Sequence, residues 1–173
     1  MLEQLRARIV RQGPSLLRVP LKFTPFALQR QLLEQVLGWQ FRQALADGDL
    51  EFLESRWLKI EVRDLALHWF MTVENGKLVV SQHAEADVSF SGDANDLILI
   101  AARKQDPDTL FFQRRLQIEG DTELGLYVKN LMDAIELEAM PAPLRLGLLQ
   151  LAEFVEAGLQ EGTVQTSRVP VSC

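Results

Sequence analysis

The sequence predicts an α/β protein of the α+β type, in which an antiparallel-rich sheet of five strands is covered by helices. Two observations carry this prediction. Apolar residues recur with the helical period before residue 48 and after residue 93, whereas between residues 57 and 91 they alternate with polar residues, as in half-buried strands. Asn75-Gly76, the preferred pair for a tight hairpin turn, lies inside the alternating region. We therefore expect one central sheet with helical extensions at both ends.

Length and composition indicate one soluble domain with short extensions. The chain has 173 residues, of which 47% are hydrophobic and 24% charged. The longest run without a charge has nine residues, and a transmembrane helix needs about 20. Early arginines argue against a signal peptide, and the lone cysteine, Cys173, excludes an internal disulfide framework. We expect a cytoplasmic protein.

Charge is distributed unevenly along the chain. The net charge is −6, yet residues 1–30 hold six basic residues and one acid, while the rest holds 12 basic and 23 acidic residues. The acidic body makes nucleic acid an improbable partner. The basic front end predicts contact with an anionic surface.

The first 26 residues form a basic amphipathic segment. We expect a short helix over residues 2–12, because Gly13-Pro14, Pro20 and Pro25 argue against one long helix. The next predicted helix runs from Pro25 to Asp47, with Thr24 as N-cap and Gly48 closing it.

The strands follow directly. Alternation predicts strands over residues 58–62, 67–73, 77–81 and 86–90, and a short fifth strand over residues 116–119. Because consecutive strands usually pair with their neighbours, an antiparallel meander is the simplest arrangement of the first four.

Helices return after the fourth strand. Asp93 is expected to cap a helix over residues 94–104, Asp106 a short helical turn, and Asp121 a helix with a one-sided apolar stripe. A last helix, apolar on more than one side, is predicted over residues 144–159. The residues from 162 onward are expected to be disordered.

Few residues suit catalysis. The chain has two histidines, His68 and His83, and lacks the spacing of a metal site, a nucleotide-binding loop or a serine hydrolase elbow. The sequence therefore indicates no cofactor and no metal. Its surplus of apolar residues has two interpretations, a filled core or the lining of a cavity for a hydrophobic guest.

Several segments resemble the sterol-carrier-protein type 2 family. They are an alternating strand that ends in Ser-Gly-Asp (residues 86–93), an Asp-Pro turn followed by aromatics (105–112) and a short strand that ends in Gly-Asp (116–121). The resemblance covers roughly residues 35–137. It implies a lipid-binding domain over residues 27–137. From the sequence itself we expect an apolar helix over 138–160 and a flexible tail over 161–173 after this domain.

Four further segments resemble bacterial accessory factors of ubiquinone biosynthesis: residues 14–20, 25–31, 101–115 and 126–137. This resemblance implies a lipid-binding role in oxygen-independent ubiquinone synthesis, on a polyprenylated intermediate or a phospholipid. It also implies work alongside two iron–sulfur hydroxylation proteins of the peptidase U32 type. The alternative is a non-catalytic interaction subunit that docks partners without carrying lipid. An enzyme that uses His68 as its acid–base group is the weakest hypothesis.

The lipid is expected in an apolar cavity between the sheet and the helices that follow it. The predicted lining residues are Trp69, Phe90, Ile100, Phe112, Tyr127, Leu131 and Leu151.

We expect the basic segment over residues 1–26 to lie in the plane of a membrane interface. The predicted membrane-contact residues are Arg6, Arg8, Arg11, Arg18 and Lys22. The alternative is that the segment packs on its own domain while the arginines stay in solvent.

Overall fold

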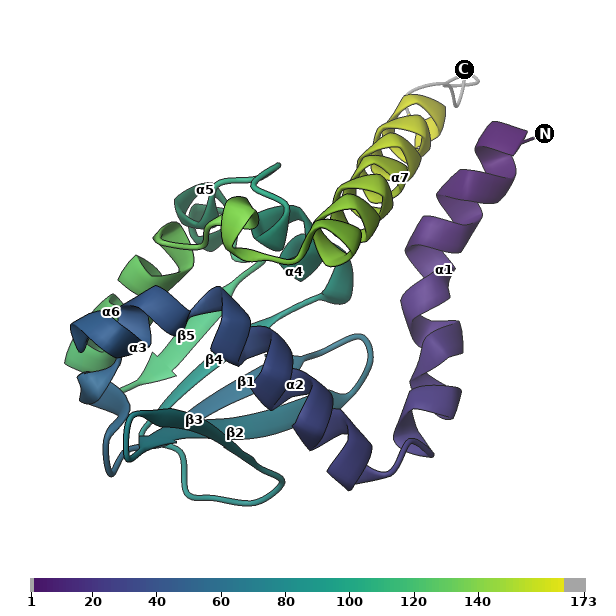
Figure 1. Cartoon of the computed structure of the whole chain (residues 1–173). Coiled ribbons are helices and arrows are strands. Elements are labelled where there is room, and N and C mark those ends of the chain that lie inside the picture. The colour runs from purple at the N-terminus through teal and green to yellow at the C-terminus, as the bar shows by residue number, and fades with distance from the viewer. Residues whose placement is uncertain (1, 167–173) are drawn as a thin grey trace.

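The computed structural model describes residues 2–166 and confirms the α+β fold (Figure 1). Helices cover one face of a five-stranded sheet, and two long helices stand side by side as an arm at one end of this body. The helices are α1 (Leu2–Lys22), α2 (Phe26–Gln40), α3 (Arg42–Asp47), α4 (Ala94–Ala101), α5 (Pro107–Phe112), α6 (Thr122–Asp133) and α7 (Ala142–Thr166), with 3₁₀ turns η1 (Glu51–Leu53) and η2 (Leu137–Ala139). The strands are β1 (Leu58–Val62), β2 (Leu67–Glu74), β3 (Lys77–Ser81), β4 (Val88–Gly92) and β5 (Gln117–Gly120).

The sheet has the order β3-β2-β1-β4-β5, and β4 pairs with β1 in parallel. The predicted hairpin is confirmed, with Asn75 and Gly76 at φ 52° and 71°. The meander is wrong for β4, which does not pair with β3. Two bonds fix the start of β4 beside the start of β1: the Trp57 N–H donates to the Asp87 carboxylate at 2.8 Å, and the Asp87 N–H donates to the Trp57 carbonyl at 2.9 Å.

The main core fills the space between the sheet and its helices. Leu53 and Leu110 are fully buried there, together with Leu58, Val88 and Leu116. A salt bridge at its edge joins Arg115 to the carboxylate of Asp96, a residue that is 4% exposed. This burial supplies most of the driving force for folding.

The observed helix caps agree only in part with the caps that the sequence predicts. The side chains of Asp106 and Asp121 accept bonds from the N–H groups of Thr109 and Leu124, as predicted. Asp93 occupies the N-cap position of α4, but Asp64 accepts the Ala94 N–H instead. Helix α4 then ends at Ala101, before the predicted residue 104.

The predicted helix over residues 25–47 is two helices. The chain leaves the helical path at Phe41, whose ring is buried in the core, and Gly48 closes α3 at φ 81° as expected. Pro25 is the N-cap of α2, whereas the Thr24 hydroxyl donates back to the Pro20 carbonyl at 3.3 Å. The N-cap prediction is therefore wrong.

Residues 2–22 form one helix despite Pro14 and Pro20, so the expected break after residue 12 is wrong. Proline lacks the N–H that would bond the carbonyl four residues earlier. For Pro14 that carbonyl belongs to Val10, and the side chain of Asn95 in α4 donates to it at 2.9 Å. A tertiary hydrogen bond thus replaces the one that proline removes.

Helix α7 is longer than predicted and forms the other half of the arm (Figure 1). Val10 of α1 is buried against Ala152 and Val155 of α7. Gly158 permits the close approach, since a Cβ at this position would lie 2.5 Å from Val10 Cγ2. The helix continues through residue 166, where disorder was expected, and residues 167–173 lie outside the described part of the chain.

Candidate functional site

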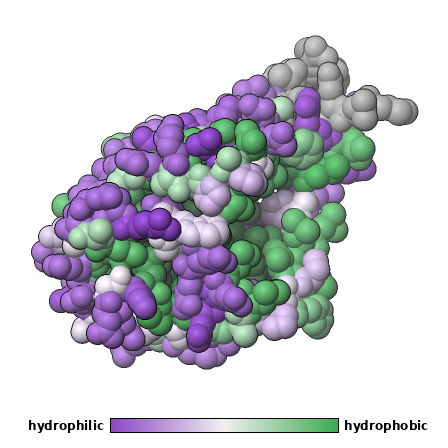
Figure 2. Space-filling model, viewed as in Figure 1, coloured by the Kyte–Doolittle hydropathy of each residue, from purple (hydrophilic) through white to green (hydrophobic). Residues whose placement is uncertain are grey.

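Many large hydrophobic side chains remain exposed, and most of them belong to three helices. Among the described residues, all such side chains except Phe112, Leu126 and Tyr127 belong to α1, α2, α7 or the residue after α1. Figure 2 shows hydrophobic side chains gathered over the arm and around a hollow between the arm and the body. We call this set the exposed apolar surface; its members are Leu5, Ile9, Leu16, Leu17, Val19, Phe23, Leu28, Leu32, Leu144, Leu146, Leu151 and Phe154. Exposed apolar side chains gathered in this way are typical of a binding surface for a lipid, a membrane or a protein.

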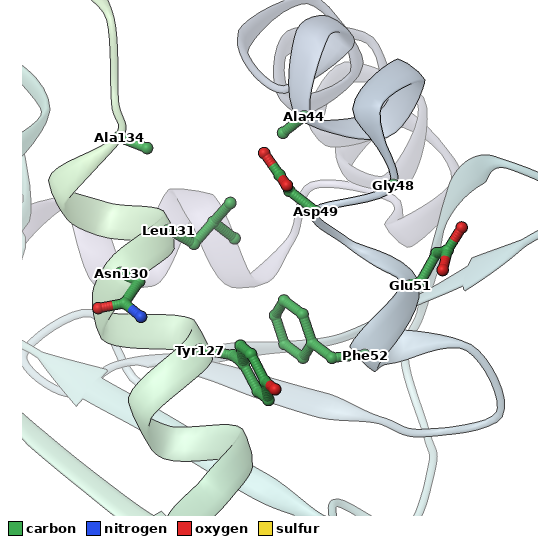
Figure 3. A pocket seen from close by; sticks show the side chains of 9 residues that line it. All are labelled: Ala44, Gly48, Asp49, Glu51, Phe52, Tyr127, Asn130, Leu131 and Ala134. Carbon is green, nitrogen blue, oxygen red and sulfur yellow. The ribbon is translucent and has the colours of Figure 1, made fainter.

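A separate pocket of about 520 Å³ lies between η1 and α6 (Figure 3). The rings of Phe52 and Tyr127 stack at one end of it, with centroids 5.0 Å apart, and Leu131 forms part of its wall. Polar side chains of Asp49 and Asn130 also face it. Its volume falls in the range of small-molecule sites, and its lining combines an aromatic surface with a few polar groups.

A third depression, of about 470 Å³, lies between α5, β5 and α6. Phe112 is 89% exposed there. The Lys129 ammonium contacts the Asp108 carboxylate at 2.7 Å, and this hydrogen bond raises the pKa of Lys129 above its usual 10.5. This depression lies outside the exposed apolar surface.

The structure does not bring the seven predicted lining residues together. Tyr127 and Leu131 share the pocket of Figure 3, whereas Phe112 lies at the third depression and Leu151 is exposed on α7. Phe90 and Ile100 are packed in the main core.

Trp69 is half-buried on β2, where its indole N–H donates to the Gln29 side chain of α2 at 3.0 Å. The expected cavity between the sheet and the following helices is therefore largely filled by side chains. Phe90 and Ile100 therefore have a structural role in the core. The sequence pattern of a strand or helix shows which residues point inward, but it does not show whether the space that they face is filled or open.

Sequence reasoning missed Phe52, Leu28 and Leu32. Phe52 precedes the alternating region and belongs to no periodic segment. Leu28 and Leu32 are four residues apart on α2, a spacing that looks like an ordinary core stripe. The core-facing positions of the same helix are nevertheless different residues, including Leu37.

The predicted membrane-contact cations lie along α1. Arg8, Arg11, Arg18 and Lys22 are exposed, and Arg6 is half-buried. No helix in the described chain is both long and apolar enough to cross a membrane.

The described residues also contain no group of three or more histidines, cysteines or acids placed to hold a metal ion. His68 is exposed on β2, with its ring edge-on to Phe70 at 5.8 Å between centroids.

Comparison with known proteins gives a consistent result. The model of the SCP-2 sterol transfer family matches residues 33–133. The ubiquinone biosynthesis accessory factor UbiT of Escherichia coli K12 is 75% identical over 169 residues, which cover 96% of this chain and 97% of UbiT. Sterol carrier protein 2 of Gallus gallus is 32% identical over 65 residues, which cover 36% of this chain and 12% of that protein.

A solved structure described as the UbiJ-SCP2 ubiquinone synthesis protein has the same fold. It superposes with a TM-score of 0.52 at 22% identity, covering 69% of this chain and 99% of that one. The family match spans more than half of the chain, and the likeness to UbiT spans nearly all of it. The chain therefore belongs to the SCP-2 sterol transfer family, in the group of ubiquinone biosynthesis accessory factors that UbiT represents.

Proposed function

We propose that this accessory factor binds a polyprenylated ring intermediate or a phospholipid during oxygen-independent ubiquinone biosynthesis. The observation that carries the proposal is the exposed apolar surface around the hollow between the arm and the body (Figure 2). If this surface stays uncovered, much apolar area remains in contact with water, which is unfavourable. A prenyl or acyl chain would cover it.

The energetics favour a long apolar guest. Each CH₂ group removed from water contributes about 0.8 kcal/mol, so about ten such groups supply a substantial binding free energy without any charged contact. The ordering of a flexible chain opposes part of this gain. A site of this kind selects for hydrophobic length and discriminates weakly between head groups.

The pathway role rests on the family resemblance. A role beside two iron–sulfur hydroxylation proteins of the peptidase U32 type is consistent with this proposal. In that arrangement, this protein presents the lipid and the two partners catalyse the hydroxylation. A location in the cytoplasm, with peripheral contact at the inner membrane face, fits the same role.

Lipid analysis of the native protein tests the proposal. We expect protein purified without detergent to carry close to one equivalent of polyprenylated or phospholipid guest, measured by native mass spectrometry and by solvent extraction. Leu28 and Leu32 are 58% and 60% exposed, so the double change Leu28→Glu, Leu32→Glu leaves the core intact and is expected to remove the guest.

The matched control is Leu126→Glu, at a leucine that is 57% exposed on α6. We expect this variant to keep its lipid. If Tyr127→Ala lost its lipid while the Leu28→Glu, Leu32→Glu variant kept it, the guest would instead lie in the pocket of Figure 3. Absence of lipid from every native preparation would contradict the carrier function. The remaining hypothesis would then be a non-catalytic subunit that docks partner proteins.

A further inference from the structure

We propose that α1 is a preformed docking helix for an anionic bilayer, with one stripe that enters the interface and another that contacts lipid phosphates. The proposal assigns the α1 part of the exposed apolar surface to a bilayer and leaves the parts on α2 and α7 to the guest. Its vesicle test can therefore fail while the protein still carries a lipid, and the reverse. It rests on the angular order of side chains around α1, on their charge and on the contacts that keep the helix folded.

The residues of α1 divide into three faces. Successive residues of a helix are rotated by about 100°, so Ala7 and Val10 share one side, which packs on α7. Nearly opposite lies the apolar stripe: Leu5, Ile9, Leu16 and Val19 of α1, together with Phe23, the residue after the helix. Its members are between 46% and 83% exposed, so neither α7 nor the body covers them.

The third face, between the other two, is the basic stripe: Arg8, Arg11, Arg18 and Lys22. All four side chains are exposed, and Glu3 is the only acidic residue in the α1 sequence. A helix with an apolar stripe beside a basic one is typical of segments that lie in the plane of a membrane interface. Each cation near an anionic leaflet strengthens binding about fivefold.

Most amphipathic segments fold only when they reach the membrane, and α1 differs from them. The Asn95 side chain satisfies the Val10 carbonyl that Pro14 leaves without a donor. Gly158 lets α1 lie close against α7. Because these contacts order the helix in advance, binding does not carry the entropy cost of folding it.

Charge favours a bilayer over a second copy of this chain. A two-fold contact through α1 would place two cationic stripes together, which is repulsive. An anionic leaflet is complementary to the basic front end and repels the acidic remainder of the chain, so it also orients the molecule with α1 toward the membrane.

Vesicle sedimentation of the full chain tests the proposal. It compares vesicles of phosphatidylcholine alone with vesicles prepared to contain about 30% phosphatidylglycerol. We expect binding to the anionic vesicles only. Arg11→Glu with Arg18→Glu is expected to lower the partition coefficient at least about 25-fold, because two attractive contacts become repulsive. Phe23→Ser is expected to lower it roughly tenfold.

Each variant has a control outside α1. Phe112 is 89% exposed on α5, against 83% for Phe23, and Arg42 is exposed at the start of α3. Phe112→Ser and Arg42→Glu are expected to bind vesicles like the unchanged protein.

Three results would overturn the proposal. They are absence of binding to anionic vesicles, equal losses in the variants and their controls, and a dimer in light scattering that Phe23→Ser converts to a monomer. Far-ultraviolet circular dichroism without lipid adds a fourth test. A gain of helix on vesicle binding, by about the length of α1, would show that the helix is not preformed.

Discussion

His68 and His83 are the only histidines of the sequence, and histidine is the side chain most often used for acid–base catalysis. His68 is exposed beside Phe70, and the backbone of His83 bonds with the Ser81 hydroxyl in the loop after β3. We therefore expect His68→Ala and His83→Ala to restore ubiquinone synthesis without oxygen in a deletion strain, as the unchanged gene does.

Quinone extraction and chromatography measure this outcome. The deletion itself should lower ubiquinone under anaerobic growth and leave the aerobic amount largely unchanged. A stably folded His68→Ala protein that behaves like the deletion would replace the accessory role with an enzymatic one.

Gly158 and Gly147 give a matched pair within α7. A Cβ at Gly158 would lie 2.5 Å from Val10 Cγ2 and 2.8 Å from Val10 Cβ, whereas one at Gly147 meets no atom within 4 Å. Gly147→Ala should raise the free energy of unfolding by up to about 1 kcal/mol, because alanine favours the helix. Gly158→Ala should lower it by about 1–2 kcal/mol, because the crowding exceeds that gain.

Urea unfolding followed by circular dichroism compares the two changes. If Gly158→Ala stabilised the protein as much as Gly147→Ala does, the close packing of α1 on α7 would be contradicted.

At the scale of elements, the continuity of α1 depends on Asn95. Its side chain donates to the Val10 carbonyl that Pro14 leaves free. Asn95→Ala should therefore cost about 1 kcal/mol of unfolding free energy. With Pro14→Ala in the background, the new N–H of residue 14 bonds Val10 itself, and the cost of Asn95→Ala should fall close to zero.

A double-mutant cycle measures this dependence as a coupling free energy of about 1 kcal/mol between the two positions. An equal cost of Asn95→Ala in both backgrounds would mean that Asn95 acts through some other contact.

The net charge of the molecule is positive over residues 1–30 and negative over the rest of the chain. Salt shortens the Debye length from about 10 Å at 0.1 M to about 3 Å at 1 M. We expect high salt to release most of the protein from isolated inner membranes, and the remainder to be held by apolar contacts. Immunoblots of washed membranes measure this release, and retention that is insensitive to salt would contradict an electrostatic contribution.

Local signals were the most predictable part of this protein. The Asn75-Gly76 turn, the Asp106 and Asp121 caps and the end of α3 at Gly48 all appear where the sequence places them. Each depends on the conformational preference or hydrogen bonding of one or two neighbouring residues, and no distant group displaces it here.

Two of the errors share a cause, which is that a distant residue overrode the local rule. Pro14 does not break α1 because Asn95 supplies the missing bond. β4 pairs with β1, and not with β3, because Asp87 is tied to Trp57. In both places the partner lies at least 30 residues away in the sequence.

The sequence by itself therefore determined the fold class, the family resemblance and the amphipathic, basic character of the front end. These follow from period, turn chemistry and charge, which are properties of neighbouring residues. Tertiary structure alone decided which apolar residues stay in solvent. Phe90 and Ile100 are core residues, whereas Leu28 and Phe23 are exposed. Apolar spacing gives the face of an element, but exposure depends on whether another element covers that face, and only the packed chain determines this.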